Sequence, residues 1–69
     1  MSAALIVKKI RLAAGLQQGE FASELKCGAA TVSHWERGTR TPRLPFIRKM
    51  VAFAKERKIK VKLEDFVLE

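Results

Sequence analysis

The 69-residue chain lacks the residues and patterns that mark several large protein classes. It has one cysteine, Cys27, which excludes an internal disulfide framework and fits a reducing cytoplasm. One cysteine and one histidine, His34, are too few to form a zinc site. No run of about eighteen apolar residues is present that could span a membrane. The apolar start, residues 1–7, is short and precedes Lys8 and Lys9, whereas basic residues come first in a signal peptide.

Catalytic groupings are missing as well. The sequence offers no Ser–His–Asp arrangement and no paired carboxylates placed for acid–base chemistry. A chain of this length forms one domain, and its small core leaves little room for an enclosed catalytic cavity. We therefore expect a single domain over residues 1–69 that is not an enzyme and that binds neither a metal nor another cofactor.

Positive charge is in clear excess. Fourteen lysines and arginines stand against seven acidic residues, which gives a formal net charge of +7. A basic surface on a small domain favours a polyanionic partner, although the same charge would also keep a protein soluble. Charge alone does not separate DNA from RNA or from an anionic membrane surface.

Apolar spacing predicts an all-α fold. Segments with helical periodicity and suitable ends lie at about residues 3–14, 18–25, 29–37 and 44–57. Gly15 and Gly38 are suited to end the first and third helices, and Pro42 lies in the loop before the fourth. Residues 58–63 alternate basic and apolar side chains as a strand does, but one short strand has no pairing partner. We therefore expect an extended connector there, followed by a short fifth helix.

The segment 29–37 predicts a helix with two different faces. Val32 and Trp35 lie three residues apart and form an apolar face that can pack on a core. The stripe with i, i+3, i+4, i+7 spacing is small and polar and consists of Ala30, Ser33, His34 and Arg37. Such a helix can rest on the core and present its other side to a partner. With the preceding helix and a three-residue turn, it describes a helix-turn-helix at about residues 18–37.

The sequence has more apolar residues on its helices than a small core needs. Leu5, Ile6 and Leu12 widen the apolar face of the first helix, and they either enlarge the core or form part of a subunit contact. Phe46 and Phe53 lie seven residues apart on the fourth helix. We expect these two phenylalanines to form an exposed apolar ridge beside the core stripe.

The span from Leu16 to Pro42 reads LQQGEFASELKCGAATVSHWERGTRTP and resembles the helix-turn-helix of the phage repressor and Cro family, also called XRE-type regulators. The matching positions are Leu16, Gln18, Phe21, Ala22, Leu25, Thr31, Val32, Ser33, Trp35, Glu36, Gly38 and Pro42. The resemblance implies a compact five-helix domain for the whole chain.

Two features depart from the pattern of this family. Lys26 takes a turn position where glycine with positive φ is common, so either the turn is rearranged or Lys26 is left-handed at a cost of about 1 kcal/mol. Ala29 and Ala30 stand at the start of the third helix, where the family usually has long polar side chains. These alanines leave fewer groups for strong hydrogen bonds to bases.

The resemblance implies that the helix at 29–37 enters the major groove of double-stranded DNA. Its base-reading surface would consist of Ala29, Ala30, Thr31, Ser33 and His34. Its phosphate contacts would come from Gln18, Lys26, Arg37, Thr39, Arg40 and Arg43, each of which would otherwise be an ordinary solvated side chain. Alanine and the threonine methyl can contact the thymine methyl, and serine and histidine can bond to base edges. We expect direct readout to be thin and DNA shape to matter more.

The resemblance also implies an ion pair between Arg11 and Glu36, which would join the first helix to the recognition helix. From the residues alone, Arg11 could instead complement the dipole of its own helix, and Glu36 could be exposed. Removing one partner of a deeply buried pair would cost roughly 3–5 kcal/mol.

We therefore expect a sequence-specific DNA-binding transcription regulator, of repressor type, that binds a near-palindromic operator as a homodimer. The dimer interface would use residues after Pro42, namely Phe46, Phe53 or the tail Ile59–Leu68. An alternative is a protein-interaction module, such as the antitoxin of a toxin–antitoxin pair or an accessory subunit of a phage-type system. A third interpretation is a domain that binds nucleic acid without sequence preference, which Ala29 and Ala30 would allow.

Overall fold

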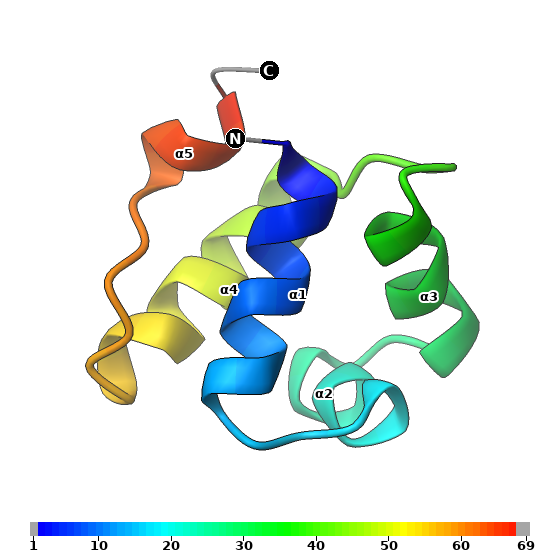
Figure 1. Cartoon of the computed structure of the whole chain (residues 1–69), viewed down its shortest axis with the longest axis horizontal. Coiled ribbons are helices and arrows are strands. Elements are labelled where there is room, and N and C mark those ends of the chain that lie inside the picture. Colours follow the sequence, from blue (N-terminus) through cyan, green and yellow to red (C-terminus); the bar gives the residue numbers. More distant parts are fainter. Residues whose placement is uncertain (1, 68–69) are drawn as a thin grey trace.

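The computed structural model describes residues 2–67, which form five helices and no strand (Figure 1). The helices are α1 (Ala3–Ala13), α2 (Gln18–Leu25), α3 (Ala29–Arg37), α4 (Leu44–Glu56) and α5 (Leu63–Val67). The prediction of an all-α fold is confirmed, and the first four helices begin and end within one residue of the predicted positions. Residues 59–62 have no regular secondary structure and lead directly into α5. None of the helices among these residues has the length and apolar character needed to cross a lipid bilayer.

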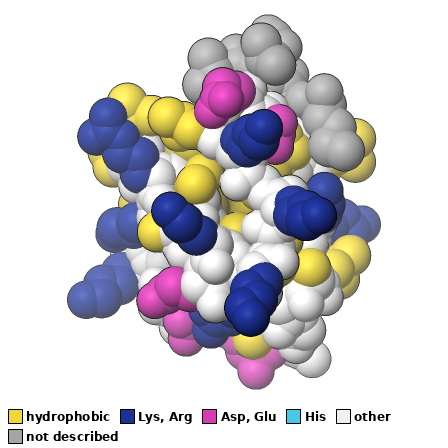
Figure 2. All heavy atoms as spheres, turned by 90° about the vertical axis from the view of Figure 1, so that its left-hand side faces the viewer, with side chains coloured by type: hydrophobic (Ala, Val, Ile, Leu, Met, Phe, Trp, Pro, Cys, Tyr) yellow, Lys and Arg dark blue, Asp and Glu magenta, His cyan; other side chains and the backbone are white. Residues whose placement is uncertain are grey.

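Helix α1 lies in the centre of the molecule, where it packs against α3, α4 and α5 (Figure 1). Helix α2 packs against α3 and α4. Seen in Figure 1, α3 lies at the right of the molecule, and the connector with α5 lies at the left. Figure 2 views that left-hand side, over which lysine and arginine side chains are spread. This arrangement leaves one side of α3 without a neighbouring helix.

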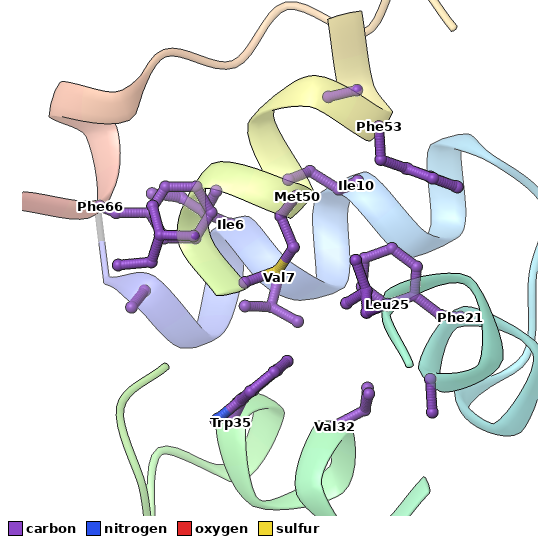
Figure 3. Close-up of a cluster of buried hydrophobic side chains, with 14 residues drawn as sticks. Ile6, Val7, Ile10, Phe21, Leu25, Val32, Trp35, Met50, Phe53 and Phe66 are labelled. Atoms are coloured by element: carbon purple, nitrogen blue, oxygen red, sulfur yellow. The ribbon is translucent and has the colours of Figure 1, made fainter. Parts of the chain in front are cut away.

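Every helix contributes apolar side chains to one core (Figure 3). The buried residues are Ala3, Ile6, Val7, Ile10, Phe21, Ala22, Leu25, Val32, Trp35, Ile47, Met50, Phe53, Ala54 and Phe66. On each long helix they recur at spacings of three and four residues, so that each helix turns one apolar stripe inward. Removing this apolar surface from water is the main contribution that holds the five helices together.

The apolar residues beyond the central stripes divide into buried and exposed ones. Ile6 is part of the core, whereas Leu5 and Leu12 are 59% and 57% exposed. Leu5 and Leu12 lie seven residues apart, on the side of α1 that faces away from the buried Ile6 and Ile10. For these two leucines, the interpretation as an enlarged core is therefore wrong.

The prediction of an exposed ridge at Phe46 and Phe53 is also wrong. Phe53 is buried, with its ring edge-on to Phe21 at a centroid distance of 5.3 Å. Phe46 is half-buried, and its ring centroid lies 5.4 Å from that of Trp35. The side of α4 that bears the two phenylalanines therefore packs on Phe21 of α2 and Trp35 of α3 and is not an exposed ridge.

The turn between α2 and α3 is built on a left-handed lysine. Lys26 has φ 59° and ψ 48°, and its backbone N–H donates to the carbonyls of Ala22 and Ser23. Gly28 has φ −86° and begins α3 as its N-cap, so it does not supply the positive φ in place of Lys26. The turn is thus not rearranged, and Lys26 has the conformation that costs a non-glycine residue about 1 kcal/mol. Lys58, after α4, is the second non-glycine residue with positive φ among those described.

Candidate nucleic-acid interface

Helix α3 has the two faces that its sequence predicts. Val32 and Trp35 are buried, at 0% and 4% exposure, and fix the helix on the core. The base-reading residues of the prediction lie on the other side: Ala29 and Ala30 are exposed, and Thr31, Ser33 and His34 are half-buried. Exposed alanines let a partner approach the helix backbone closely. The structure therefore places small side chains at the start of α3 and polar ones at its middle.

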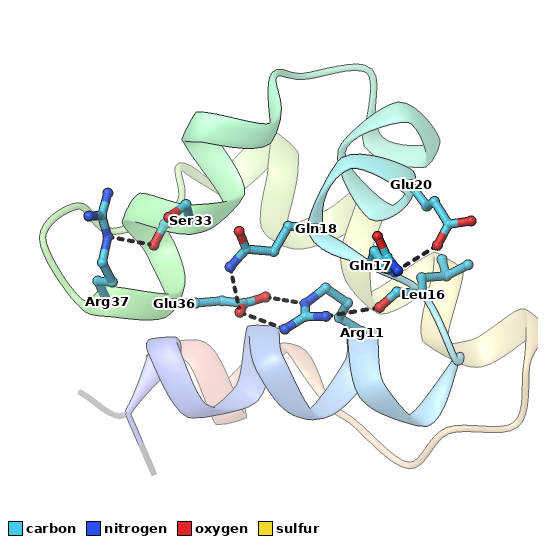
Figure 4. A network of polar contacts seen from close by, with 8 residues as sticks. All are labelled: Arg11, Leu16, Gln17, Gln18, Glu20, Ser33, Glu36 and Arg37. Carbon is cyan, nitrogen blue, oxygen red and sulfur yellow. Dashed lines mark hydrogen bonds and ion pairs between the residues drawn. The ribbon is translucent and has the colours of Figure 1, made fainter.

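A polar cluster joins α3 to α1 and α2 (Figure 4). Arg11 Nε lies 2.6 Å from Glu36 Oε2, and Arg11 Nη2 donates to Glu36 Oε1 at 2.9 Å. Arg11 Nη1 donates to the carbonyl of Leu16 at 2.9 Å, and Gln18 Nε2 donates to Glu36 Oε1 at 3.1 Å. The Arg11 and Glu36 side chains are only 12% and 6% exposed. This bidentate pair, with its two supporting bonds, fixes the position of α3 relative to both preceding helices.

The protonation of Glu36 follows from its partners. Burial by itself would raise the pKa of this carboxyl, but the hydrogen bonds from Arg11 and Gln18, with the charges of Arg11 and Lys8, lower it below its usual value. Chiefly through its hydrogen bond to Glu36, Arg11 has a raised pKa. Both groups are therefore charged at neutral pH, and the pair is stable as an ion pair.

Gln18, predicted to bind a phosphate, is already engaged within the protein. Its amide donates one hydrogen to Glu36, which leaves the second hydrogen for another acceptor. At the same helix start, the backbone N–H of Gln17 donates to Glu20 Oε1 at 2.8 Å (Figure 4). A carboxylate here competes with a phosphate for the positive end of the α2 dipole. The structure thus gives Gln18 a positioning role, and a phosphate contact there remains an expectation.

Residues after α3 fold back onto its last turn. Thr39 Oγ1 lies 2.9 Å from His34 Nδ1 and donates to the His34 carbonyl at 3.2 Å. The backbone N–H groups of Thr39 and Arg40 also point to this carbonyl, at 3.1 and 3.4 Å. Arg37 Nε donates to the Ser33 carbonyl at 3.4 Å. The hydroxyl of Thr39, predicted to contact a phosphate, is therefore bonded within the protein.

The remaining predicted phosphate contacts, Lys26, Arg40 and Arg43, flank α3. Lys26 precedes the helix, and the exposed Arg40 and Arg43 follow it. Both arginines line a hollow of about 480 Å³ together with Thr31, Trp35, Thr41 and Phe46. The hollow combines two cations and two hydroxyls with an aromatic floor, which suits a sugar–phosphate backbone beside α3. Thr41 was not among the predicted phosphate contacts, because its only signal in the sequence is its place in a basic loop.

The comparisons with known proteins agree with this geometry. A family model described as helix-turn-helix matches residues 7–55, which is most of the chain and includes α2, α3 and all of α4 but its last residue. No curated protein and no solved structure matches the chain significantly. The structure has the features of a helix-turn-helix within this span. These are the packing of α2 on α3, the turn at Lys26 and the buried apolar stripe of α3. The chain therefore belongs to the helix-turn-helix family, of the phage repressor and Cro (XRE) type, and is a DNA-binding transcription regulator.

Proposed function

We propose that this regulator recognises particular DNA sequences by inserting α3 into the major groove. The observation that carries the proposal is the orientation of α3. Its bulky residues, Val32 and Trp35, are buried, and its small and polar side faces outward. A major groove about 12 Å wide accepts a helix that presents such a side, and the cations before and after α3 can then reach the flanking phosphates.

The side chains on the outer side of α3 support only weak direct recognition of bases. Ala29, Ala30 and the methyl group of Thr31 favour apolar contact with thymine methyls, while Ser33 and His34 offer single hydrogen bonds. Bidentate contacts, which give the strongest discrimination, need arginine, asparagine or glutamine near the start of the helix. We infer that much of the specificity comes from the shape and deformability of the operator.

A homodimer is part of the proposal, because one module reads too few base pairs for a specific site. Two copies would place their α3 helices in successive major grooves, about 34–36 Å apart. The burial of Phe53 removes it from the candidate interfaces, which leaves the half-buried Phe46 and the tail Ile59–Leu68, whose Leu68 lies outside the described residues. A repressor acts by occupying such an operator, and we propose this mode of regulation.

One observation favours the second candidate function, a protein-interaction module such as an antitoxin. Leu5 and Leu12 are more than half exposed and lie on one side of α1. Two exposed leucines on one side of a helix offer apolar surface that a partner protein can bury. Stoichiometric capture of one partner protein by the chain, lost on the double substitution Leu5→Ser and Leu12→Ser, would favour this function. It would not exclude DNA binding.

Selection from random DNA duplexes tests the main proposal. The wild-type chain should enrich a near-palindromic sequence with half-sites one helical turn apart, and the double substitution Ala30→Gln with His34→Ala should change that sequence. Lys60→Gln serves as the control, since Lys60 lies in the connector, on the opposite side of the molecule from α3 (Figure 1). Equal affinity for random and selected duplexes at the same salt concentration would contradict the proposal and would instead fit binding without sequence preference.

A further inference from the structure

The hydrogen bonds around Thr39 determine where the proton of His34 lies. A carbonyl oxygen can only accept, so the bond between Thr39 Oγ1 and the His34 carbonyl uses the single hydrogen of the hydroxyl. The oxygen Oγ1 can then only accept from His34 Nδ1, which lies 2.9 Å away. A neutral imidazole has one protonated nitrogen. In this arrangement that nitrogen is Nδ1, and Nε2 has a free lone pair.

The position of Thr39 just after α3 also favours a hydroxyl that donates to the His34 carbonyl and accepts from His34 Nδ1. The carbonyls in the last turn of a helix have partial negative charge. The His34 carbonyl already attracts the backbone N–H groups of Gly38, Thr39 and Arg40. The threonine hydroxyl, 3.2 Å from this oxygen, directs its hydrogen toward the same negative end. Nδ1 is left as the donor to Oγ1.

The other ring nitrogen is available to a partner. Among the described residues, no buried side-chain nitrogen or oxygen lacks a hydrogen-bond partner, and the ring of His34 bonds only through Nδ1. Nε2 therefore reaches the surface. His34 belongs to the outward stripe of α3 with Ala30, Ser33 and Arg37. In the complex proposed above, that stripe faces the base edges of the major groove.

We infer that Thr39 is a positioning residue that fixes the tautomer of His34, so that Nε2 accepts a hydrogen bond from the exocyclic amine of adenine or cytosine. This inference rests on the proposed function and deepens it. In the major groove, adenine N6 and cytosine N4 are the donors, whereas guanine presents N7 and O6 and thymine presents O4, all acceptors. A ring that only accepts at Nε2 therefore prefers adenine or cytosine on the contacted strand. It also disfavours guanine, which a donating histidine would prefer.

The first test uses the free protein, so its result does not depend on DNA. The ¹⁵N spectrum of the single histidine separates a protonated ring nitrogen from one with a free lone pair, at a pH where titration shows the ring to be neutral. The wild type should have its proton on Nδ1. Thr39→Val keeps the branched shape but removes the hydroxyl, and should move protons to Nε2. Thr39→Ser retains the hydroxyl and should behave as the wild type. A wild-type proton on Nε2, with Oγ1 donating to Nδ1, would overturn the inference.

The second test reads the base preference. Duplexes selected by the wild type should have one position per half-site that is adenine or cytosine, with a preference of about three- to tenfold over guanine and thymine, as one hydrogen bond supplies. His34→Ala and Thr39→Val should each remove the preference at that position alone. Thr39→Ser should keep it. A phosphate role for Thr39 would instead lower the affinity for all sequences equally.

The outcomes separate failure of this inference from failure of the proposed function. If the wild type enriches no sequence, the proposed function is wrong, and the base-reading inference falls with it. If the wild type enriches a sequence but His34→Ala alters no position, or the affected position is guanine or thymine, only the inference is wrong. Loss of preference in Thr39→Val, restored in Thr39→Ser, supports it, since a merely structural role would not distinguish one base position.

Discussion

Arg11 and Glu36 form a bidentate ion pair across 25 positions of sequence, with Nε and Oε2 2.6 Å apart. The pair joins the central helix α1 to the last residues of α3. Both side chains are largely shielded from water, and the remaining donors of Arg11 and Gln18 complete the cluster. Helix α3 is therefore fixed by charge at one end and by Val32 and Trp35 along its length.

Breaking this pair should destabilise the fold far more than breaking a surface contact. Arg11→Met keeps the side-chain length but leaves Glu36 as a shielded charge with one donor, Gln18. We expect the free energy of unfolding to fall by about 3 kcal/mol. Arg48→Met, at an exposed position of α4, should change it by less than about 0.5 kcal/mol. Urea unfolding followed by Trp35 fluorescence measures both, and equal effects would contradict a stabilising role for the pair.

Acid should remove the contribution of Glu36. Its pKa is lower in the folded chain than the unfolded value of about 4.3, so the unfolded state binds more protons below that pH. The stabilisation is thus fully present above the unfolded pKa and is lost as pH falls through the folded pKa. Glu36→Gln should flatten the decline of unfolding free energy below about pH 4, whereas Glu24→Gln, in an exposed pair 3.9 Å from Arg57, should not. An unchanged acid slope in Glu36→Gln would count against this account.

The left-handed turn should respond to glycine. Lys26→Gly removes the strain of a Cβ at φ 59°, and we expect a gain of about 0.5–1 kcal/mol in the free energy of unfolding. Lys26→Ala removes the same charge but retains the strain, so it separates the two effects and should give no such gain. Chemical denaturation of the three proteins in parallel is the measurement. Should alanine stabilise as much as glycine, charge repulsion and not backbone strain would be the cause.

The loop arginines should determine the salt dependence of DNA binding. If Arg40 and Arg43 each neutralise one phosphate, replacing either with glutamine lowers the log–log slope of affinity against salt by about 0.9. Lys60→Gln on the other side of the molecule should leave that slope unchanged. Binding isotherms at several salt concentrations on one duplex provide the slopes. A uniform loss of affinity without a change of slope would mean that these arginines act on the fold and not on phosphates.

Local rules were enough to predict the helices and the two faces of α3. Gly15 and Gly38 end their helices in the left-handed conformation, at φ 72° and 78°, which is what glycine at a helix end favours. The spacing of Val32 and Trp35 predicted the buried side of α3, because a nine-residue helix has room for only one apolar stripe. Features determined by spacings of three and four residues were thus accessible from the sequence.

Features that depend on how helices cross were not accessible. The seven-residue spacing of Phe46 and Phe53 shows that they share a side of α4, but not that α2 and α3 cover this side. The bonds of Gln18 to Glu36 and of Thr39 to His34 depend on the path of the chain between helices. The residue types show that Gln18 and Thr39 can form hydrogen bonds. Only the tertiary structure shows that their partners are Glu36 and His34.

The shielding of the Arg11–Glu36 pair has a consequence for how the protein can be released from DNA. Mobile ions screen exposed charges within about 8–10 Å at moderate ionic strength but act weakly on charges that water does not reach. Arg40 and Arg43 are exposed, whereas Arg11 and Glu36 are not. A rise in ionic strength should therefore detach the protein while its helices keep their arrangement, so that it rebinds as soon as the salt is diluted.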